Sequence, residues 1–113
     1  MHVGDAVEVL TTQGAVIESH VRGLQTHKQK LETALAGSRV AVNLAGVSVE
    51  QAARGGVVAR PGMLQPSTLL DVRLEMLSAA RLKTSASLRH NAEVKVFSGA
   101  AMSLARVWLL DAD

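Results

Sequence analysis

Four basic side chains between positions 22 and 30 are the first candidates for chemistry in this sequence. Arg22, His27, Lys28 and Lys30 are donors of the kind that contact nucleic-acid phosphates, which supply affinity without reading base sequence. The same cluster fits a solvated strand face and loop, and no aromatic residue lies beside it to stack a base. Charge alone favours this second interpretation.

Arg39 is a separate candidate because the sequence places it on a strand with its side chain outward. Over residues 39–45, Val40, Val42 and Leu44 alternate with more polar positions, which predicts that these three side chains face a core. A rigid outward arginine presents a fixed fork of donors to an anion. It also fits a surface arginine paired with a nearby carboxylate, and the pattern leaves both readings open.

Motifs for catalysis are missing from the 113 residues. The phosphate loop G-x-x-x-x-G-K-[ST] is absent, and so are G-x-S-x-G and H-E-x-x-H. The four histidines are scattered, there are no cysteines, and no carboxylate pair stands out as a general acid and base. We therefore expect no catalytic residue, no metal ligand and no cofactor held by this chain itself.

Composition limits the fold and the partners. The length allows one compact domain or two very small ones, and with only Phe97 and Trp108 as aromatic residues the core must be built from Val, Leu, Ala and Met. No apolar run approaches the roughly 20 residues needed to cross a bilayer, and the lack of cysteine fits a cytoplasmic protein. The net charge of +2 weakly favours an anionic partner such as RNA.

Short alternating segments between turn signals predict an all-β barrel or sandwich. The stretch 25–30 is expected to be a loop or strand edge, 48–53 a single helical turn from the capping-box spacing of Ser48 and Gln51, and 78–87 a loop or short helix. The proline- and glycine-containing stretch 61–66 is the best boundary. The expected strands are residues 5–10, 15–24, 39–45, 57–60, 70–76, 92–96 and 103–110.

Several short motifs, in order, carry a family resemblance. They are Val21-Arg22-Gly23-Leu24-Gln25, Thr26-His27-Lys28-Gln29-Lys30, Asn43-Leu44-Ala45-Gly46, Arg54-Gly55 and, later, Leu88-Arg89-His90-Asn91-Ala92-Glu93-Val94. Up to residue 62 the chain resembles the second domain of the elongation factor Tu class, and within that class the selenocysteine-specific factor. From Leu69 onward it is similar to the start of that factor's third domain.

The resemblance implies small antiparallel β-barrel modules of the translational GTPase domain 2 and domain 3 type. It implies a domain 2-like barrel over residues 1–62 without its opening strands, a linker over 63–68, and a domain 3-like barrel over 69–113 without its closing strands. The chain is thus expected to be a fragment of a larger factor. GTP and Mg²⁺ would be bound by that factor's GTPase domain, outside this sequence.

In function, the resemblance implies delivery of selenocysteinyl-tRNA to the ribosome. The position of Arg39 lines the aminoacyl pocket of the family, where an arginine contacts the selenol, and Gln25 stands where elongation factor Tu has a glutamate near the terminal adenosine. The tRNA-binding surface is expected to include Arg22, Gln25, His27, Lys28 and Lys30.

Two alternative functions stay open. The chain could be a barrel of another translational GTPase, similar to elongation factor Tu, or a stand-alone β module that recruits protein. In each case we expect a cytoplasmic protein without membrane contact. Incomplete barrels leave unpaired strand edges, which predicts a homo-oligomer or strand exchange between copies.

Overall fold

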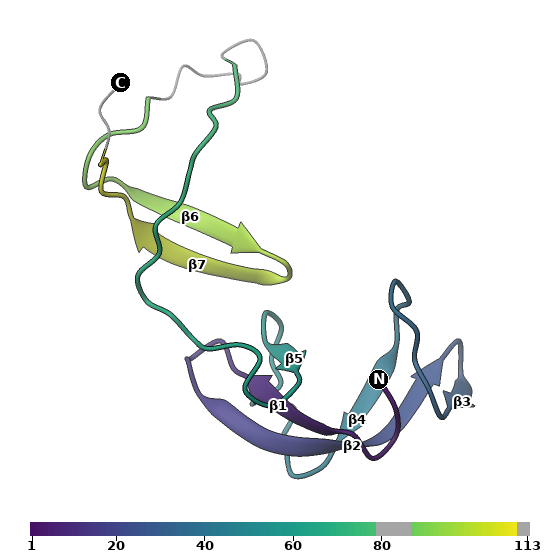
Figure 1. Cartoon of the computed structure of the whole chain (residues 1–113). Coiled ribbons are helices and arrows are strands. Elements are labelled where there is room, and N and C mark those ends of the chain that lie inside the picture. Colours follow the sequence, from purple (N-terminus) through teal and green to yellow (C-terminus); the bar gives the residue numbers. More distant parts are fainter. Residues whose placement is uncertain (79–86, 111–113) are drawn as a thin grey trace. The chain divides into compact units, whose positions relative to one another are not determined.

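The computed structural model describes residues 1–78 and 87–110 of the chain. They fall into two units, Met1–Ser67 and Thr68–Asp113, whose strands are labelled in Figure 1. All regular secondary structure in these described residues is antiparallel β-strand, which confirms the all-β prediction. Among them there is no helix long and apolar enough to span a bilayer. The predicted barrel boundaries stay a prediction.

The first unit is a five-stranded sheet built around one long strand. The central strand β2 pairs with β1, β3 and β4, and β1 also pairs with β5 (Figure 1). At Leu24, β2 contacts Leu31 of β3 and Val42 of β4, so these two strands lie on opposite sides of it. The bounds are β1 Ala6–Leu10, β2 Val16–Thr26, β3 Gln29–Leu31, β4 Ala41–Leu44 and β5 Val57–Ala59.

The four strands predicted in this unit are confirmed, with shifted ends. The largest difference is in residues 25–30, where β2 continues through Thr26 and β3 begins at Gln29. The predicted loop is therefore only the two residues between them. The polar composition of this stretch concealed the strands, because a solvated hairpin needs no apolar alternation.

A bulge in β2 changes which of its side chains face the core. The register with β4 shifts between Val21 and Gly23, which leaves Arg22 as an extra residue without an opposite partner. Val21 and Leu24 are both buried although they are three positions apart, whereas strict alternation would put them on opposite faces. The bulge therefore brings Leu24 into the core and turns Gln25 outward.

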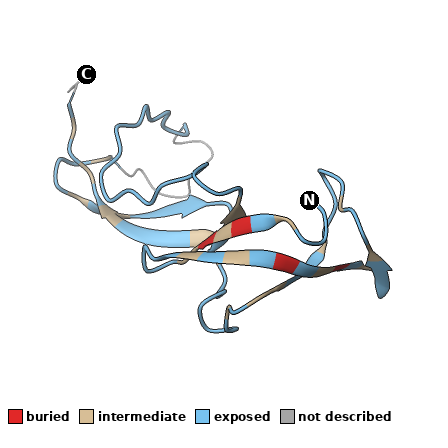
Figure 2. Ribbon diagram, turned by 60° about the horizontal axis from the view of Figure 1, so that its bottom comes forward, coloured by how far each residue is buried: buried red, intermediate tan, exposed pale blue. Residues whose placement is uncertain are grey.

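The core of this unit is small and aliphatic. Val7, Val9, Val21 and Leu24 are each less than 5% exposed and appear as red bands on β1 and β2 in Figure 2. Around this core lie half-buried apolar side chains, and the predicted inward residues Val40, Val42 and Leu44 are confirmed among them. The side chains packed against the cluster of Val7, Val21 and Leu24 are Leu31, Ala34, Val40, Val42, Leu44 and Val58.

The predicted capping box forms, but no helix follows it. The Ser48 backbone N–H donates to Gln51 Oε1 at 2.9 Å, and the Gln51 N–H donates to Ser48 Oγ at 3.1 Å. One backbone bond, from Ala52 N–H to the Ser48 carbonyl, completes a turn. The expected helical turn is thus present as a hydrogen-bonded turn only, because a single bond does not offset the cost of helix nucleation.

In the described part of the second unit, the strands form one hairpin, β6 Glu93–Ser98 and β7 Ala101–Arg106. These correspond to the predicted strands 92–96 and 103–110, displaced by a few residues toward the turn at Gly99. The predicted strand 70–76 is wrong: these residues are exposed and form no strand. Alternation assigns side chains to faces, but a strand also needs a hydrogen-bonded neighbour, and no described segment pairs with this one. The expected loop or helix at 78–87 lies almost wholly outside the described residues.

Replacing Val9 tests the small core. Val9 is 2% exposed, so Val9→Ala should lower the free energy of unfolding by about 1.5–3 kcal/mol through lost burial and a residual cavity. Val49→Ala is the matched control, because Val49 is 86% exposed, and it should change stability by less than about 0.5 kcal/mol. Urea unfolding followed by circular dichroism measures both. Equal losses would contradict a core centred on β1 and β2.

Candidate functional site

The loop that joins β2 to β3 consists of His27 and Lys28 alone. Both residues have positive φ, 46° and 64°, as the central residues of a type I′ turn must. Such turns favour Asn-Gly, because a residue with a Cβ is disfavoured in the left-handed region. The turn thus presents a histidine and a lysine at the tip of the hairpin despite a backbone cost.

Arg39 lies just before β4 rather than on it, which corrects the predicted strand position. The preceding segment closes on itself, since Gly37 has φ 82° and Ser38 Oγ donates to the Leu35 carbonyl at 2.7 Å. The backbone carbonyl of Arg39 then accepts a hydrogen bond from Thr26 Oγ1 at 3.1 Å. The Arg39 side chain is exposed, as expected. The backbone of Arg39 is thus hydrogen-bonded to the last residue of β2.

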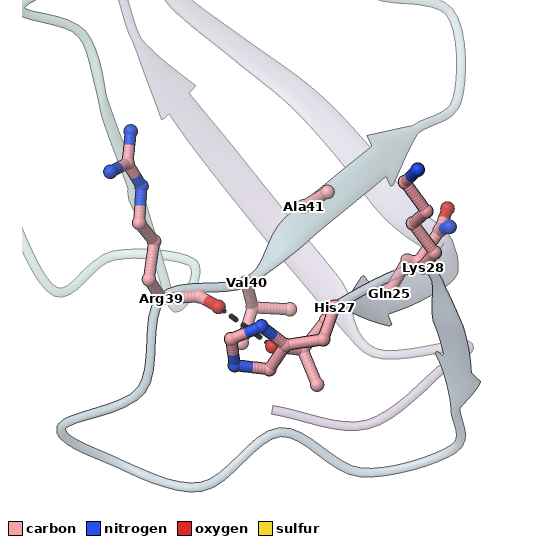
Figure 3. Close-up of a pocket in the computed structure, with 7 residues that line it drawn as sticks. Gln25, His27, Lys28, Arg39, Val40 and Ala41 are labelled. Carbon is pink, nitrogen blue, oxygen red and sulfur yellow. Dashed lines mark hydrogen bonds between the residues drawn. The ribbon is translucent and has the colours of Figure 1, made fainter.

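These two segments enclose an open hollow of about 470 Å³. In Figure 3 the side chains of Arg39 and Lys28 extend on either side of the start of β4, with His27 between them and the Thr26–Arg39 hydrogen bond dashed. Four of the six predicted site residues therefore meet here. The lining residues are Gln25, Thr26, His27, Lys28, Arg39, Val40 and Ala41.

The other two predicted residues, Arg22 and Lys30, do not line the hollow. Lys30 lies opposite Gln25 across β2 and β3, so it belongs to the same hairpin. Arg22 is the extra residue of the bulge and is exposed. The structure thus gathers the basic residues into a hollow at the hairpin tip and a flank along β2 and β3.

The hollow carries positive charge without a carboxylate in its lining. Among residues 1–78 and 87–110, no acidic side chain forms an ion pair with Lys28 or Arg39; the ion-pair contact found there joins His2 and Asp5 at 3.6 Å. The Asp5 carboxylate accepts the His2 backbone N–H at 2.7 Å, which lowers the pKa of Asp5. No carboxylate of the described residues pairs with Arg39, as the surface ion-pair interpretation would require. The guanidinium of Arg39 is therefore open to an external anion.

Thr26, Val40 and Ala41 were not predicted from the sequence as site residues. Thr26 bonds to a carbonyl 13 positions away, and no local pattern shows such a partner. The described residues hold no group of three or more histidine and acidic side chains that could bind a metal ion. The hollow is suited to binding an anion through a guanidinium, an ammonium and an imidazole.

Sequence comparison assigns a family to this sheet and its basic hollow. The family model for elongation factor Tu domain 2 matches residues 1–59, which contain all five strands of the first unit and every lining residue. The chain belongs to the elongation factor Tu domain 2 family.

Two curated relatives show which members of this family the chain is similar to. A selenocysteine-specific elongation factor of Desulfomicrobium baculatum is 37% identical over 113 residues, all of this chain and 17% of the relative. Elongation factor Tu 2 of Streptomyces avermitilis is 42% identical over 78 residues, 69% of this chain and 19% of the relative. The resemblance stated from the sequence is thereby confirmed. The chain spans less than a fifth of each relative's length, and no solved structure shows significant similarity to it.

The strained turn can be tested by relieving it. Lys28→Gly should raise the free energy of unfolding by about 1 kcal/mol, because glycine adopts the positive φ of 64° without steric cost. Lys30→Gly removes the same charge from the strand β3 and should lower stability by roughly 0.5–1 kcal/mol. Urea titration of both variants gives the comparison. Shifts in the same direction would show that charge, not backbone geometry, dominates at the turn.

Proposed function

We propose that this chain is the part of a selenocysteine-specific elongation factor that holds the aminoacyl end of selenocysteinyl-tRNA. The observation that carries the proposal is that Arg39, His27 and Lys28 all line one hollow, whose lining contains no carboxylate. The identity of 37% over the whole chain to a selenocysteine-specific factor supports it. Delivery of that tRNA to the ribosome would be the task of the complete factor.

Arg39 has the role of recognising the amino acid. A selenol is more acidic than a thiol and is largely ionised at neutral pH, whereas the hydroxyl of serine stays neutral. A guanidinium without an ion-pairing partner stabilises the ionised form, so it separates the two substrates through a charge rather than through size. An open hollow is therefore sufficient to distinguish selenocysteine from serine.

The remaining basic residues have the role of holding the RNA. His27 and Lys28 in the hollow, with Lys30 and Arg22 along the flank, contact phosphates, which positions the RNA without reading its bases. Gln25 lies in the middle pair of the β2–β3 ladder, opposite Lys30, where its amide would reach the terminal adenosine of the acceptor end. The exposure of all five side chains supports this division of roles.

The complete factor that we propose is a cytoplasmic GTPase. Its GTPase domain would bind GTP and Mg²⁺ and would contact this chain as a neighbour in the same polypeptide. The described residues contribute to the surface that carries the aminoacyl-tRNA and take no part in hydrolysis.

A second candidate keeps the family and changes the substrate. The 42% identity to an elongation factor Tu over 78 residues favours a barrel of another translational GTPase, in which Arg39 has no selenol to contact. A stand-alone β interaction module is a third candidate, supported by the exposed apolar side chains of the second unit, such as Phe97, 73% exposed, and Trp108, 71% exposed. An upstream reading frame that encodes a phosphate loop would favour the elongation factors.

Arg39→Ala in the complete factor tests the proposal. Loss of a charged donor to an ionised selenol should weaken selenocysteinyl-tRNA binding by about tenfold or more, while seryl-tRNA binding should change little. Arg60→Ala is the control, because Arg60 is exposed and lies outside the hollow. Filter binding or fluorescence with both aminoacylated tRNAs measures the ratio. Equal losses for the two tRNAs would reject selenol recognition and favour the second candidate.

The 113-residue chain is also proposed to associate with itself. Within the described residues, β3 and β4 each pair only with β2, and β5 pairs only with β1, so their outer edges are available for another strand. We expect a dimer or larger species, or exchange of strands between copies, by multi-angle light scattering. A monomer at every concentration from micromolar to millimolar would contradict this expectation.

A further inference from the structure

We propose that Thr26 is the positioning residue of the hollow and sets where Arg39 stands relative to the turn of His27 and Lys28. The inference rests on the proposed function, because Arg39, the residue that Thr26 would position, is the one proposed to recognise the amino acid. Thr26 itself need not touch the substrate. Its hydroxyl would act through the backbone of Arg39.

The β-ladder ends before it reaches Arg39. The last pair between β2 and β4 is Gln25 with Ala41, so Arg39 lies two residues beyond the final ladder position. Its carbonyl accepts the hydroxyl of Thr26 at 3.1 Å. This side-chain bond extends the connection between the two segments past the point where backbone pairing stops.

Thr26 connects the two halves of the hollow beyond the end of the ladder. It is the last residue of β2 and is followed at once by His27, so its backbone fixes the start of the strained turn. Its β-branched side chain has few χ1 rotamers and is half-buried, so the hydroxyl is directed rather than free to rotate. A single residue therefore links the turn of His27 and Lys28 to the backbone of Arg39.

Without that hydroxyl, the Arg39 carbonyl would be left to water. The segment before it is closed by its own bond, from Ser38 to Leu35, and would remain folded while its position against β2 became looser. The guanidinium would then spend less time at the distance from His27 and Lys28 that a bound aminoacyl end requires. Binding of the charged amino acid should suffer more than binding of the neutral one.

Two substitutions separate the hydroxyl from the rest of the side chain. Thr26→Val keeps the shape and the β-branch and removes the donor, so the strand is retained. Thr26→Ser keeps the donor and removes only a methyl group. A hydrogen-bond role requires that Val be defective and that Ser restore function, whereas a packing role requires the reverse order.

The first measurement uses the 113-residue chain and ¹⁵N relaxation by NMR. Thr26→Val should lower the order parameter of the Arg39 amide and leave that of Val42, within β4, unchanged. Thr26→Ser should match the wild type at both positions. An unchanged Arg39 amide in a folded Thr26→Val variant would overturn the inference.

The second measurement is a double-mutant cycle in the complete factor, with selenocysteinyl-tRNA and seryl-tRNA as probes. Thr26→Val should weaken selenocysteinyl-tRNA binding about three- to tenfold, the range for one hydrogen bond, and should have no further effect in an Arg39→Ala background. The same loss in both backgrounds, or wild-type binding by Thr26→Val, would overturn the inference. If Arg39→Ala itself binds both tRNAs as the wild type does, the proposed function fails instead, so the two failures are distinguishable.

Discussion

The extra residue that β2 carries at Arg22 is the constraint on which both the core and the hollow depend. Before the bulge, the inward face of β2 ends with Val21; after it, the inward position is Leu24 and the outward one is Gln25. A strand without the bulge would bury Gln25 and expose Leu24. The bulge thus lets one strand supply the core at both ends and still turn a polar side chain toward the hollow.

Much of the first unit could be predicted because β1, β4 and the part of β2 before the bulge alternate. The inward positions in and just before β4 follow from the alternation of Val40, Val42 and Leu44 and are confirmed by their packing against the core. The bulge was missing from the prediction: a glycine inside a strand, such as Gly23, often marks a bulge, but it does not determine which neighbouring residue is the extra one. The predicted strand over 70–76 shows the reverse failure, since its alternation is good but no described segment pairs with it.

The charged residues of the candidate site could be predicted from the sequence, but the residue that positions Arg39 could not. Lys28 and Arg39 are visible in the sequence as cations, and the structure gathers them at the same hollow. The contact of Thr26 with Arg39 cannot be predicted from the sequence, because a hydroxyl that bonds to a carbonyl 13 residues away gives no periodic pattern. The strain at His27 is equally hidden, since a two-residue loop of this composition does not resemble the glycine-containing turns that usually mark a hairpin.

The residues that form the hollow lie closer together in the sequence than the residues that the outer strands of the sheet bring together. All its lining residues lie between positions 25 and 41, whereas β1 and β5 join residues as far apart as Glu8 and Ala59. Loop closure costs more entropy as the separation grows, and topologies of low contact order fold faster. We therefore expect the contacts within the hairpin and between Thr26 and Arg39 to close before β5 pairs with β1 as the chain folds.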